Sequence, residues 1–557
     1  LDLPHRWTTD REILLIKGWC FSKSGRQIAG VRVKIGPKTR FARYGLERDD
    51  IAASFPDCPA AKRSGFTVEL RVPKGKSTVR LEAIEQGNDW QPFLEQTVER
   101  EASADGDDWV EDDSPSRARF HEQIVKLAPL SAAKAFRLIE AGLREHARRS
   151  NVASPFITVI TPTHDSKPEW LAAAALSLLN QGLTEWEWCL ADDGSENRET
   201  RKLLELLGGV GRGVQISLGT GGGISSATNR ALDLARGDYV CFLDHDDLLH
   251  PEALESIRDK LEEGFDVVYT DEDKLDDATG DLVEPFFKPD WSPEYFRGAM
   301  YVGHLLCVRR ELATAARFDS SFDGVQDFEF MLRLSETGPR IGHIPRILYH
   351  WRKTPGSVAA KTDAKPLIGA LQEKAVNAHL ARLGLSARAE QSELPHRLKL
   401  VPLPRENPPR VSIIIPTRDA PEMLGRCLKS IFEKTSHPNF EVIVIDNETT
   451  DEQALALMKQ YPVRQIAFPG PFNFSRANNQ GAEAATGALL VFLNNDTEVV
   501  AKDWLQHLAY YAEQPDVGAA GALLAYEDGT VQHAGVALGM RGTADHVMRG
   551  FPLQVDG

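Results

Sequence analysis

Three short polar motifs follow predicted strands in the middle of the chain and could together form a site. They are Thr161–Thr163, Asp192–Asp193 and Asp244–Asp246, each placed directly after an apolar run. Open α/β sheets bind their ligands outside the carboxyl ends of the strands, so we expect the three motifs to face one crevice. Within the Asp-His-Asp motif both carboxylates point to the same side of an extended chain, because side-chain direction repeats every two residues.

Paired carboxylates at this spacing predict a divalent cation. Asp244 and Asp246 offer the oxygen ligands that Mg²⁺ or Mn²⁺ prefers, and such ions are usually shared with substrate phosphates. The chain has a net charge of −16, so a cation would also supply the local positive charge that an anionic ligand needs. The alternative is that these Asp-rich turns are helix caps or surface loops.

A dinucleotide site of the Rossmann type is the nearest structural competitor. Its GxGxxG motif does not follow the first strand, where the sequence reads His-Asp-Ser-Lys-Pro. The glycine run Gly219–Gly223 lies in the wrong place for that motif, and we interpret it as a plain loop.

The strands that carry these motifs are predicted by apolar runs without polar alternation. The runs at 157–160, 188–190 and 239–243 alternate with helical patterns at 170–179 and 227–235. Strands of this kind, separated by helices, indicate a mostly parallel sheet covered on both faces. We therefore predict the α/β fold class.

The second half of the chain repeats the first. The matched pairs are Pro162 with Pro416, Asp192 with Asp446, Asn229 with Asn479, and Asp246 with Asp496. The first two pairs share one offset, and the last two share an offset only four residues smaller. Motifs that keep one order with a single small slip indicate a tandem duplication of one domain.

Up to about residue 100 the pattern has period two instead. Apolar residues alternate with polar ones around Val31–Ile35 and Phe66–Val72, which is typical of short antiparallel strands in a small sandwich. The stretch Arg100–Ser116 is acidic and poor in apolar residues, so we interpret it as a linker before a helix. We predict a β-rich domain at 1–100, an acidic linker and helix at 101–150, a first α/β domain at 151–360, a helical linker at 361–408 and a second α/β domain at 409–557.

Length and composition exclude several classes of protein. At 557 residues, 42% of them hydrophobic, the chain can build three or four cores. The acidic balance argues against binding to nucleic acid. No apolar run reaches the ~20 residues of a membrane span, and the six cysteines form no CxxC pair, which is typical of reduced thiols in the cytosol. The chain starts with neither a signal peptide nor Met, so we expect it to begin inside a longer product.

Further motifs give the chain a specific resemblance. It carries the runs Tyr269–Lys274, Pro285–Pro293, Gly303–His304, Gln326–Glu329 and Tyr349–Arg352. With these runs it resembles the inverting glycosyltransferase family 2, which has the GT-A fold. It is especially similar to the multi-domain bacterial enzymes that assemble O-antigens and other surface polysaccharides. The likeness covers both α/β repeats and leaves out the N-terminal segment.

The resemblance implies roles for the matched positions. Nucleotide-sugar binding is implied for Thr161, Pro162, Asp192, Asp193, Asn229 and Asp244 in the first repeat, and for Pro416, Asp446 and Asn479 in the second. Binding of Mn²⁺ or Mg²⁺ is implied for Asp244, Asp246, His350 and Asp496. Asp327 matches the catalytic base. The alternatives are that Asp327 caps its own helix and that His350 is a structural histidine.

The implied reaction is a single displacement that inverts the anomeric carbon. The acceptor hydroxyl would lose its proton to Asp327 while it attacks opposite the nucleoside diphosphate. The expected donor is a UDP-, dTDP- or GDP-sugar, and the expected acceptor is a glycan or lipid-linked glycan. We expect a cytoplasmic protein with at most peripheral membrane association. In the alternative, one repeat is a non-catalytic scaffold that binds nucleotide or glycan.

The second repeat departs from the pattern of the first. Asn494–Asp496 keeps only the last carboxylate of the metal motif. The stretch from Asp496 to Gly557 is shorter than the one that separates Asp246 from Asp327. The sequence thus predicts two tandem GT-A domains after a small all-β sandwich-like domain, the second GT-A domain being C-terminally incomplete.

Overall fold

The computed structural model divides into two compact units, Leu1–Asp112 and Asp113–Gly557. It describes residues 8–9, 13–22, 28–36, 38–46, 48, 51–52, 55, 58, 59–72, 75–85, 90–100, 132–149, 154–209, 213–353, 365–394, 396–538 and 544–553. The acidic linker predicted at 100–116 lies almost entirely outside these residues. The helix predicted after it is present as α3 (Ala132–Arg149).

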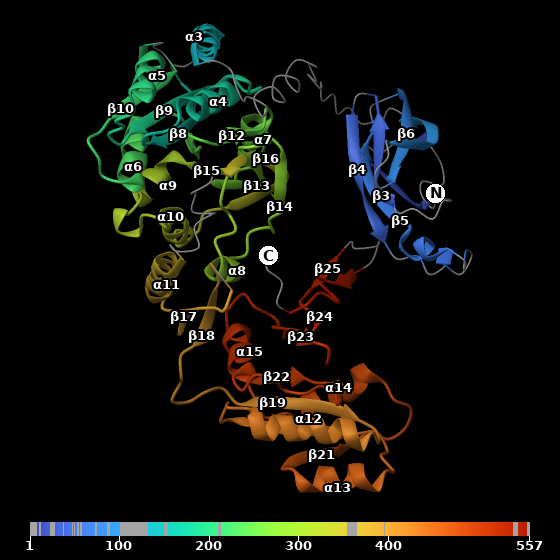
Figure 1. The fold of residues 1–557 in the computed structure, drawn as a ribbon. Helices are drawn as coiled ribbons and strands as arrows, with labels where there is room; N and C mark the ends of the chain where they lie inside the picture. Colours follow the sequence, from blue (N-terminus) through green and yellow to red (C-terminus); the bar gives the residue numbers. More distant parts are fainter. Residues whose placement is uncertain are drawn as a thin grey trace. The chain divides into compact units, whose positions relative to one another are not determined.

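A seven-stranded sheet forms the N-terminal unit (Figure 1). Its strands are β1 (Thr8–Thr9), β2 (Ile13–Trp19), β3 (Ile28–Ile35), β4 (Lys38–Leu46), β5 (Gly65–Arg71), β6 (Gly75–Glu85) and β7 (Gln91–Arg100). They hydrogen-bond in the order β1-β7-β6-β3-β4-β5-β2, and every pair except β1 with β7 is antiparallel. Val31, Val33 and Ile35 of β3 are buried in one core with Leu14 and Ile16 of β2. The period-two pattern thus predicted a real half-buried sheet.

The first α/β domain begins with an alternation of strands and helices. Its elements up to the third motif are β8 (Ile157–Thr163), α4 (Pro168–Leu179), β9 (Trp186–Asp192), α5 (Arg198–Gly209), β10 (Val214–Leu218), α6 (Ile224–Leu234) and β11 (Tyr239–Phe242). The later elements are β12 (Leu248–Leu249), α7 (Ala253–Glu262), β13 (Val267–Asp276), β14 (Leu282–Phe286), α8 (Pro293–Gly298), β15 (Leu306–Arg309), α9 (Arg310–Ala316), α10 (Gln326–Ser335) and β16 (Ile341–Lys353).

The sheet of this domain is mixed rather than purely parallel. Its order is β10-β9-β8-β11-β15-β13-β16-β12, with β14 beside β13. The first four strands are parallel, whereas β15 runs antiparallel to both β11 and β13. Helices cover both faces, because Val159 of β8 packs in the core that contains α4, and Ile160 packs in the opposite core that contains α6. Continuous apolar strands are expected when both faces are buried.

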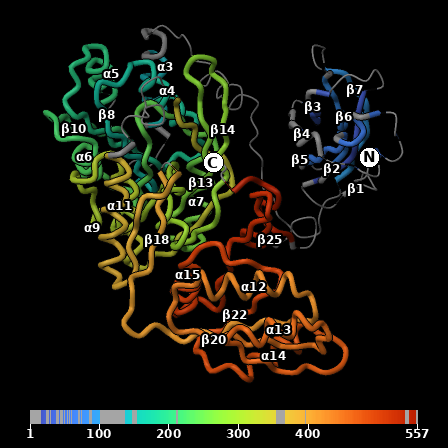
Figure 2. The backbone as a smooth tube through the Cα atoms, turned by 60° about the horizontal axis from the view of Figure 1, so that its bottom comes forward, coloured from blue at the N-terminus to red at the C-terminus, as the bar shows by residue number. Residues whose placement is uncertain are grey.

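The second α/β domain, drawn in orange in Figure 2, contains a four-stranded sheet. Its elements are β19 (Val411–Thr417), α12 (Pro421–Lys434), β20 (Phe440–Asp446), α13 (Glu452–Gln460), β21 (Val463–Ala467), α14 (Phe474–Ala484), β22 (Leu489–Phe492) and α15 (Trp504–Ala512). The strand order β21-β20-β19-β22 reproduces β10-β9-β8-β11, and all of these pairs are parallel. The duplication inferred from motif order is therefore also present in the fold.

The segment between the two α/β domains contains more than the predicted helix. After α11 (Lys365–Arg382) come the antiparallel strands β17 (Ala387–Gln391) and β18 (Leu398–Pro402). Ala387, Ala389, Leu398 and Leu400 of this hairpin are buried in the core of the first domain. The predicted helix of this linker is present as α11, whereas the hairpin was not predicted, because short alternating strands carry a weaker sequence signal than a helix.

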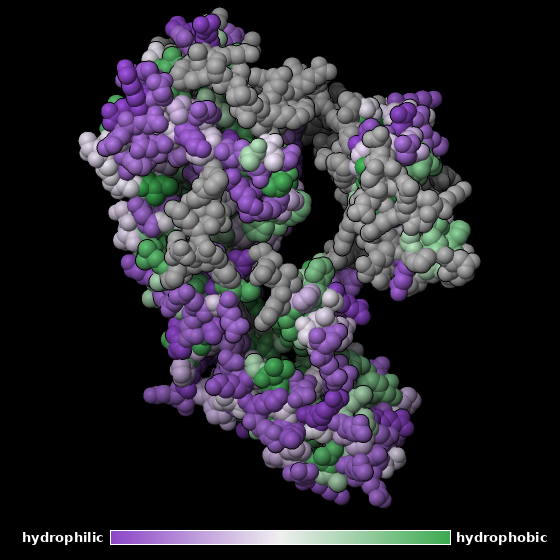
Figure 3. All heavy atoms as spheres, in the orientation of Figure 1, coloured by the Kyte–Doolittle hydropathy of each residue, from purple (hydrophilic) through white to green (hydrophobic). Residues whose placement is uncertain are grey.

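The described part of the chain contains no helix long and apolar enough to cross a membrane. On the face drawn in Figure 3, apolar side chains occur in small groups on a mainly hydrophilic surface. All six cysteines are free thiols, as the sequence predicted.

Candidate functional site

A cavity of about 290 Å³ opens at the carboxyl ends of β8, β9 and β11. It is lined by Pro162, Thr163, His164, Asp193, Gly223, Ile224, Ala227, Asp244, His245 and Asp246. The expectation that the three polar motifs face one crevice is confirmed. The parallel alignment of the strands brings together residues far apart in the sequence.

The structure distinguishes between the two adjacent aspartates after β9. Asp193 lines the cavity, and its carboxylate accepts hydrogen bonds from Gly223 N at 2.8 Å and from Arg230 Nη2 at 3.1 Å. The Asp192 carboxylate is buried and accepts from Ser195 N at 3.0 Å and from Thr163 Oγ1 at 3.3 Å. Asp193 is therefore the one placed to contact a ligand, and Asp192 shapes the turn.

Thr161 also differs from its predicted role. Its side chain is fully buried, and its hydroxyl accepts a hydrogen bond from Trp188 Nε1 at 2.8 Å. Thr161 and Thr163 point to the same face of β8, because side chains alternate along a strand, but Thr161 lies further inside the sheet. The last two residues of β8 are Pro162 and Thr163. Both line the cavity, so Thr163 takes the place that the sequence analysis gave to Thr161.

The last residue of the glycine run, Gly223, is part of the cavity wall, which gives the loop predicted from the sequence a place at the site. Gly221, Gly222 and Gly223 all have positive φ, and Gly223 is the N-cap of α6. A Cβ on Gly223 would lie 2.2 Å from Asp323 Oδ2, so no larger residue fits there. The buried Ser225 Oγ in the first turn of α6 has no hydrogen-bond partner among the described residues. The positive end of α6 thus faces the cavity, where it favours an anionic ligand.

Asn229 has a structural role instead of the predicted contact with the nucleotide. Its Nδ2 donates to Phe318 O at 2.8 Å, and its Oδ1 accepts from Phe318 N at 2.9 Å. Both ends of the amide therefore fix the loop before α10 against α6. Arg230, one residue later, is the side chain that reaches Asp193, and the sequence analysis missed it.

The loop that carries Asp244 and Asp246 is braced from β16. Arg352 donates from its backbone N to Asp247 Oδ1 at 2.7 Å and from Nε to the carbonyl of Asp246 at 2.6 Å. Tyr349 Oη donates to Asp247 Oδ2 at 2.6 Å and accepts from Asp244 N at 3.2 Å. Burial and the charges of the two neighbouring aspartates raise the pKa of Asp247 well above its usual range. Asp247 thus anchors the loop, which leaves Asp244 and Asp246 facing the cavity.

These donors fit a divalent cation in part. No group of three His, Cys, Asp or Glu side chains in the described ranges forms a closed metal cage. Asp244 and Asp246 nevertheless line one cavity, and the Nδ1 of His245 there is buried without a hydrogen-bond partner in the described structure. Burial is the main factor that raises the pKa of Asp246, which an added positive charge would reverse. Two carboxylates with open positions are the usual protein share of a Mg²⁺ site that also contains phosphates.

The carboxylate of Asp327 interacts electrostatically with that of Asp244. It is the second residue of α10, whose N-cap is Val325, so Asp327 is not the helix cap. Burial raises the pKa of Asp327, the charge of Asp244 raises it further, and the nearby His304 lowers it. His304 Nε2 is in turn 3.9 Å from Asp244 Oδ2. His304 thus lies beside Asp244, and its charge also acts on Asp327.

His350 makes other contacts. Its Nδ1 is 2.6 Å from Asp273 Oδ1, and its ring lies 6.3 Å from that of His250. Burial and the neighbouring His350 lower the pKa of His250 to about 4. The described contacts of His350 do not include Asp244 or Asp246, and its role as a metal ligand stays a prediction. Two other histidines lie beside the acidic pair: His245 is 3.9 Å from Asp246, and His304, which appears in the sequence only within a motif, is 3.9 Å from Asp244.

Comparison with known proteins identifies the family. Residues 158–308 and 412–542, just over half of the chain, match the sequence profile described as Glycosyl transferase family 2. The chain belongs to glycosyltransferase family 2. Both α/β repeats are matched, so the tandem arrangement and the GT-A fold predicted from the sequence are confirmed.

The names of two similar curated proteins refer to the synthesis of polysaccharides. The chain is 40% identical over 402 residues to the O-antigen biosynthesis protein RfbC of Myxococcus xanthus, a stretch that covers 70% of this chain and 31% of that protein. It is 32% identical over 237 residues to a chondroitin synthase of Escherichia coli, covering 42% of this chain and 33% of the relative. The chain therefore spans about a third of the length of each of these curated relatives. Among solved structures it is similar to S. aureus TarS 1-349 in complex with UDP-GlcNAc, with 20% identity, a TM-score of 0.33, and coverage of 41% of this chain and 72% of that 1-349 chain.

The second repeat of this glycosyltransferase differs at the equivalent positions. Asn447 replaces Asp193, and its amide nitrogen donates to the carbonyls of Phe468 and Gly470, both at 2.9 Å. Asp446 matches Asp192 also in its contacts, because it accepts from Thr449 N at 2.9 Å. Pro416 is buried, whereas Asn479 and Asp496 are exposed. The second repeat thus keeps the framework of the site and loses most of its carboxylates.

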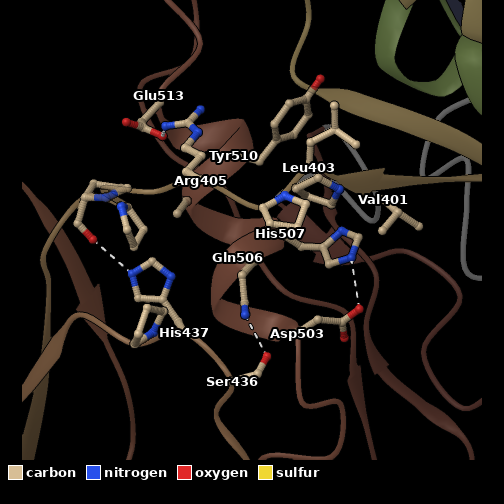
Figure 4. A pocket seen from close by; sticks show the side chains of 16 residues that line it. Val401, Leu403, Arg405, Ser436, His437, Asp503, Gln506, His507, Tyr510 and Glu513 are labelled. Atoms are coloured by element: carbon tan, nitrogen blue, oxygen red, sulfur yellow. Dashed lines mark hydrogen bonds and ion pairs between the residues drawn. The ribbon is translucent and has the colours of Figure 1, made fainter.

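A second cavity of about 320 Å³ lies beside the second repeat (Figure 4). Pro409 and Pro438 in its wall precede β19 and β20, so it opens at the amino ends of these strands. Its carboxylates are already paired, Asp503 with His507 and Glu513 with Arg405. This cavity is therefore not the counterpart of the one in the first repeat.

We expect Asp193→Ala to weaken nucleotide binding by about 10- to 100-fold, because a hydrogen bond to a charged group contributes roughly 1.5–3 kcal/mol. Calorimetric titration with the nucleoside diphosphate would measure the change. The matched control is Asn447→Ala at the equivalent position of the second repeat. An equal loss in that control would place the measured binding in the second repeat instead.

The pKa of Asp327 also predicts a pH profile. Because burial raises that pKa, the carboxylate takes up its proton at a higher pH than an ordinary aspartate does. We expect the acidic limb of log kcat/KM to fall at an apparent pKa above the usual aspartate value. A limb at the ordinary value, or a limb that Asp327→Glu does not shift, would contradict this assignment.

Proposed function

We propose that the first repeat of this glycosyltransferase is an inverting, metal-dependent enzyme that moves a sugar from a nucleotide donor to a growing cell-surface glycan. The observation that carries the proposal is that Asp244 and Asp246 line one cavity, while the charge of Asp244 acts on the carboxylate of Asp327. The names of the relatives, which include O-antigen biosynthesis and chondroitin synthesis, support a polysaccharide acceptor.

In this proposal the cavity holds the nucleoside diphosphate. Asp193, fixed by Arg230, would accept a hydrogen bond from the nucleotide, and the first turn of α6 would face the diphosphate. Asp244 and Asp246 would hold Mn²⁺ or Mg²⁺. When bound, such a cation stabilises negative charge on the leaving diphosphate.

Asp327 would act as the general base. Its carboxylate accepts the proton of the acceptor hydroxyl as that oxygen forms a bond to the anomeric carbon. The bond from the anomeric carbon to the diphosphate oxygen breaks at the same time on the opposite face, so the configuration inverts. The raised pKa of Asp327 makes it a stronger base than an exposed aspartate.

The second repeat is proposed to be a non-catalytic module that binds nucleotide or glycan. The replacement of Asp193 by Asn447 and the pair Asn494–Asn495 before Asp496 support this division of labour. We also propose that the first α/β domain extends over residues 151–360 and the second over residues 409–557.

A screen of UDP-, dTDP- and GDP-sugars for release of nucleoside diphosphate tests the function. We expect release from one donor to depend on Mn²⁺ or Mg²⁺ and to increase when a glycan acceptor is added. NMR of the product should show the anomeric configuration opposite to that of the donor. Release that is equally fast in excess chelator, or a product with retained configuration, would overturn the proposal.

A further inference from the structure

Lys288 is a fully buried lysine in the first repeat. It follows β14, and its side chain has no exposed surface. Its Nζ donates to Glu272 Oε2 at 2.9 Å, to Val302 O at 2.7 Å and to His304 O. An ammonium group has three donors, so every one of them is used.

Glu272 closes this arrangement from the other side. Its Oε2 accepts from His304 N at 2.9 Å as well as from Lys288. Both polar groups of the His304 backbone, the N–H and the C=O, are thus held by one buried ion pair. Gly303 has a φ of +43°, and a Cβ there would lie 2.9 Å from Glu272 Oε2, so the turn requires glycine.

The imidazole of His304 is fixed as firmly as its backbone. The ring stacks on Tyr349 with centroids 4.8 Å apart and an interplanar angle of 16°, and it meets Trp351 edge-on at 5.9 Å. Its Nε2 is 3.9 Å from Asp244 Oδ2. The ring is therefore held beside the carboxylate of Asp244, which lines the cavity.

We infer that His304 contacts the transferred sugar and that the buried Glu272–Lys288 pair is the device that positions it. The inference rests on the proposed function, in which the anomeric carbon must lie between the diphosphate beside Asp244 and the acceptor beside Asp327. His304, whose Nε2 is 3.9 Å from Asp244 Oδ2, borders the diphosphate side of that position. An imidazole nitrogen can exchange a hydrogen bond with a sugar hydroxyl.

The ion pair acts through His304 in this inference. Neither Glu272 nor Lys288 lines the cavity that contains Asp244 and Asp246. The side chain of Lys288 contacts Glu272, the carbonyls of Val302 and His304 and, at 5.9 Å, the ring of Phe286. Glu272 also accepts from His304 N. Glu272 and Lys288 are positioning residues, and their removal should affect turnover only as far as it moves His304.

A double-mutant cycle tests this dependence with the donor that the wild-type enzyme turns over. We expect His304→Ala to lower kcat by about 10- to 100-fold and Glu272→Gln by about tenfold, both with KM changed less than threefold. In the His304→Ala background, Glu272→Gln should change kcat by less than twofold, because coupled residues are not additive. Effects that multiply in the double variant would overturn the inference.

The control is another ion pair of a buried carboxylate in the same domain. Glu187 is fully buried and pairs with Arg236 at 2.6 Å, in a strand position away from the cavity. Glu187→Gln should lower the melting temperature without the selective loss of kcat. If Glu272→Gln does not fold, Gly303→Ala serves in its place, because its Cβ displaces the same turn.

A structural measurement separates this inference from the proposed function. In a crystal structure of the Glu272→Gln or Gly303→Ala variant, the His304 ring should leave its stacked position on Tyr349. An unmoved ring would overturn the positioning role whether or not a donor is found. If the wild-type protein uses none of the donors but the ring is displaced in the variant, the proposed function is contradicted. The positioning of His304 by the Glu272–Lys288 pair is then still confirmed.

Discussion

Asp327→Asn should lower kcat by about 10²- to 10⁴-fold, the range that a positioned general base contributes. The amide has nearly the same shape as the carboxylate but cannot take up the proton of the acceptor hydroxyl. Asp327 does not line the cavity assigned to the nucleotide, so the affinity for nucleoside diphosphate should stay within about threefold of wild type. Turnover assays and calorimetry on the same preparation would measure both quantities.

The matched control for this variant lies in the same helix. Glu329 is buried in α10 and forms an ion pair with Arg333 at 2.5 Å. Glu329→Gln makes the same chemical change two residues away without touching the proposed site. We expect a lower melting temperature with kcat changed far less than in Asp327→Asn. Equal losses of kcat in the two variants would remove the basis for Asp327 as the base.

Asp246→Asn is expected to reduce turnover by at least about 100-fold and to abolish its dependence on Mn²⁺. Two carboxylates carry the proposed cation, so the loss of one halves the charge that the protein contributes. Substitution of residues that only hydrogen-bond to metal ligands already lowers metal affinity or activity by about 10- to 100-fold. Titration of activity against Mn²⁺ concentration would show the change in apparent affinity.

Asp496→Asn provides the control in the second repeat. Asp496 is the equivalent of Asp246 but is exposed and follows two asparagines. If the first repeat alone is active, this variant should keep nearly full turnover and the same Mn²⁺ dependence. A loss as large as that of Asp246→Asn would show that the second repeat takes part in the chemistry.

The run Tyr269–Lys274 illustrates how a motif can serve a site without entering it. Tyr269 Oη donates to Pro289 O at 2.6 Å, and Asp271 Oδ1 accepts from Lys288 N at 2.9 Å. His343 joins Asp271 at 2.9 Å and the exposed Asp290 at 3.2 Å. These contacts fix the segment between β14 and α8 against β13. The acidic residues of this run are thus structural, although their composition resembles that of a metal site.

The sequence by itself determined the architecture of this glycosyltransferase. Apolar runs without polar alternation indicated strands buried on both faces, and the repeated motif order indicated two copies of one domain. The motifs after β8, β9 and β11 could be placed at one crevice, because the ends of parallel strands meet at one edge of a sheet. The mixed character of the sheet and the β17–β18 hairpin could not be predicted, since they depend on long-range pairing between short segments.

Only the tertiary structure decided which side chains of each motif face the cavity. Asp192 turns into its loop whereas Asp193 lines the cavity, and Thr161 is buried inside the sheet whereas Thr163 lines the cavity at the end of the strand. Residues of the same type one or two positions apart give no sign of this in the sequence. In the structure, the Asn229 side chain also hydrogen-bonds to the backbone of Phe318, and His304 lies beside Asp244. The physical reason is that side-chain direction depends on strand register and on the partners available for each hydrogen bond, and both are set by elements far away in the chain.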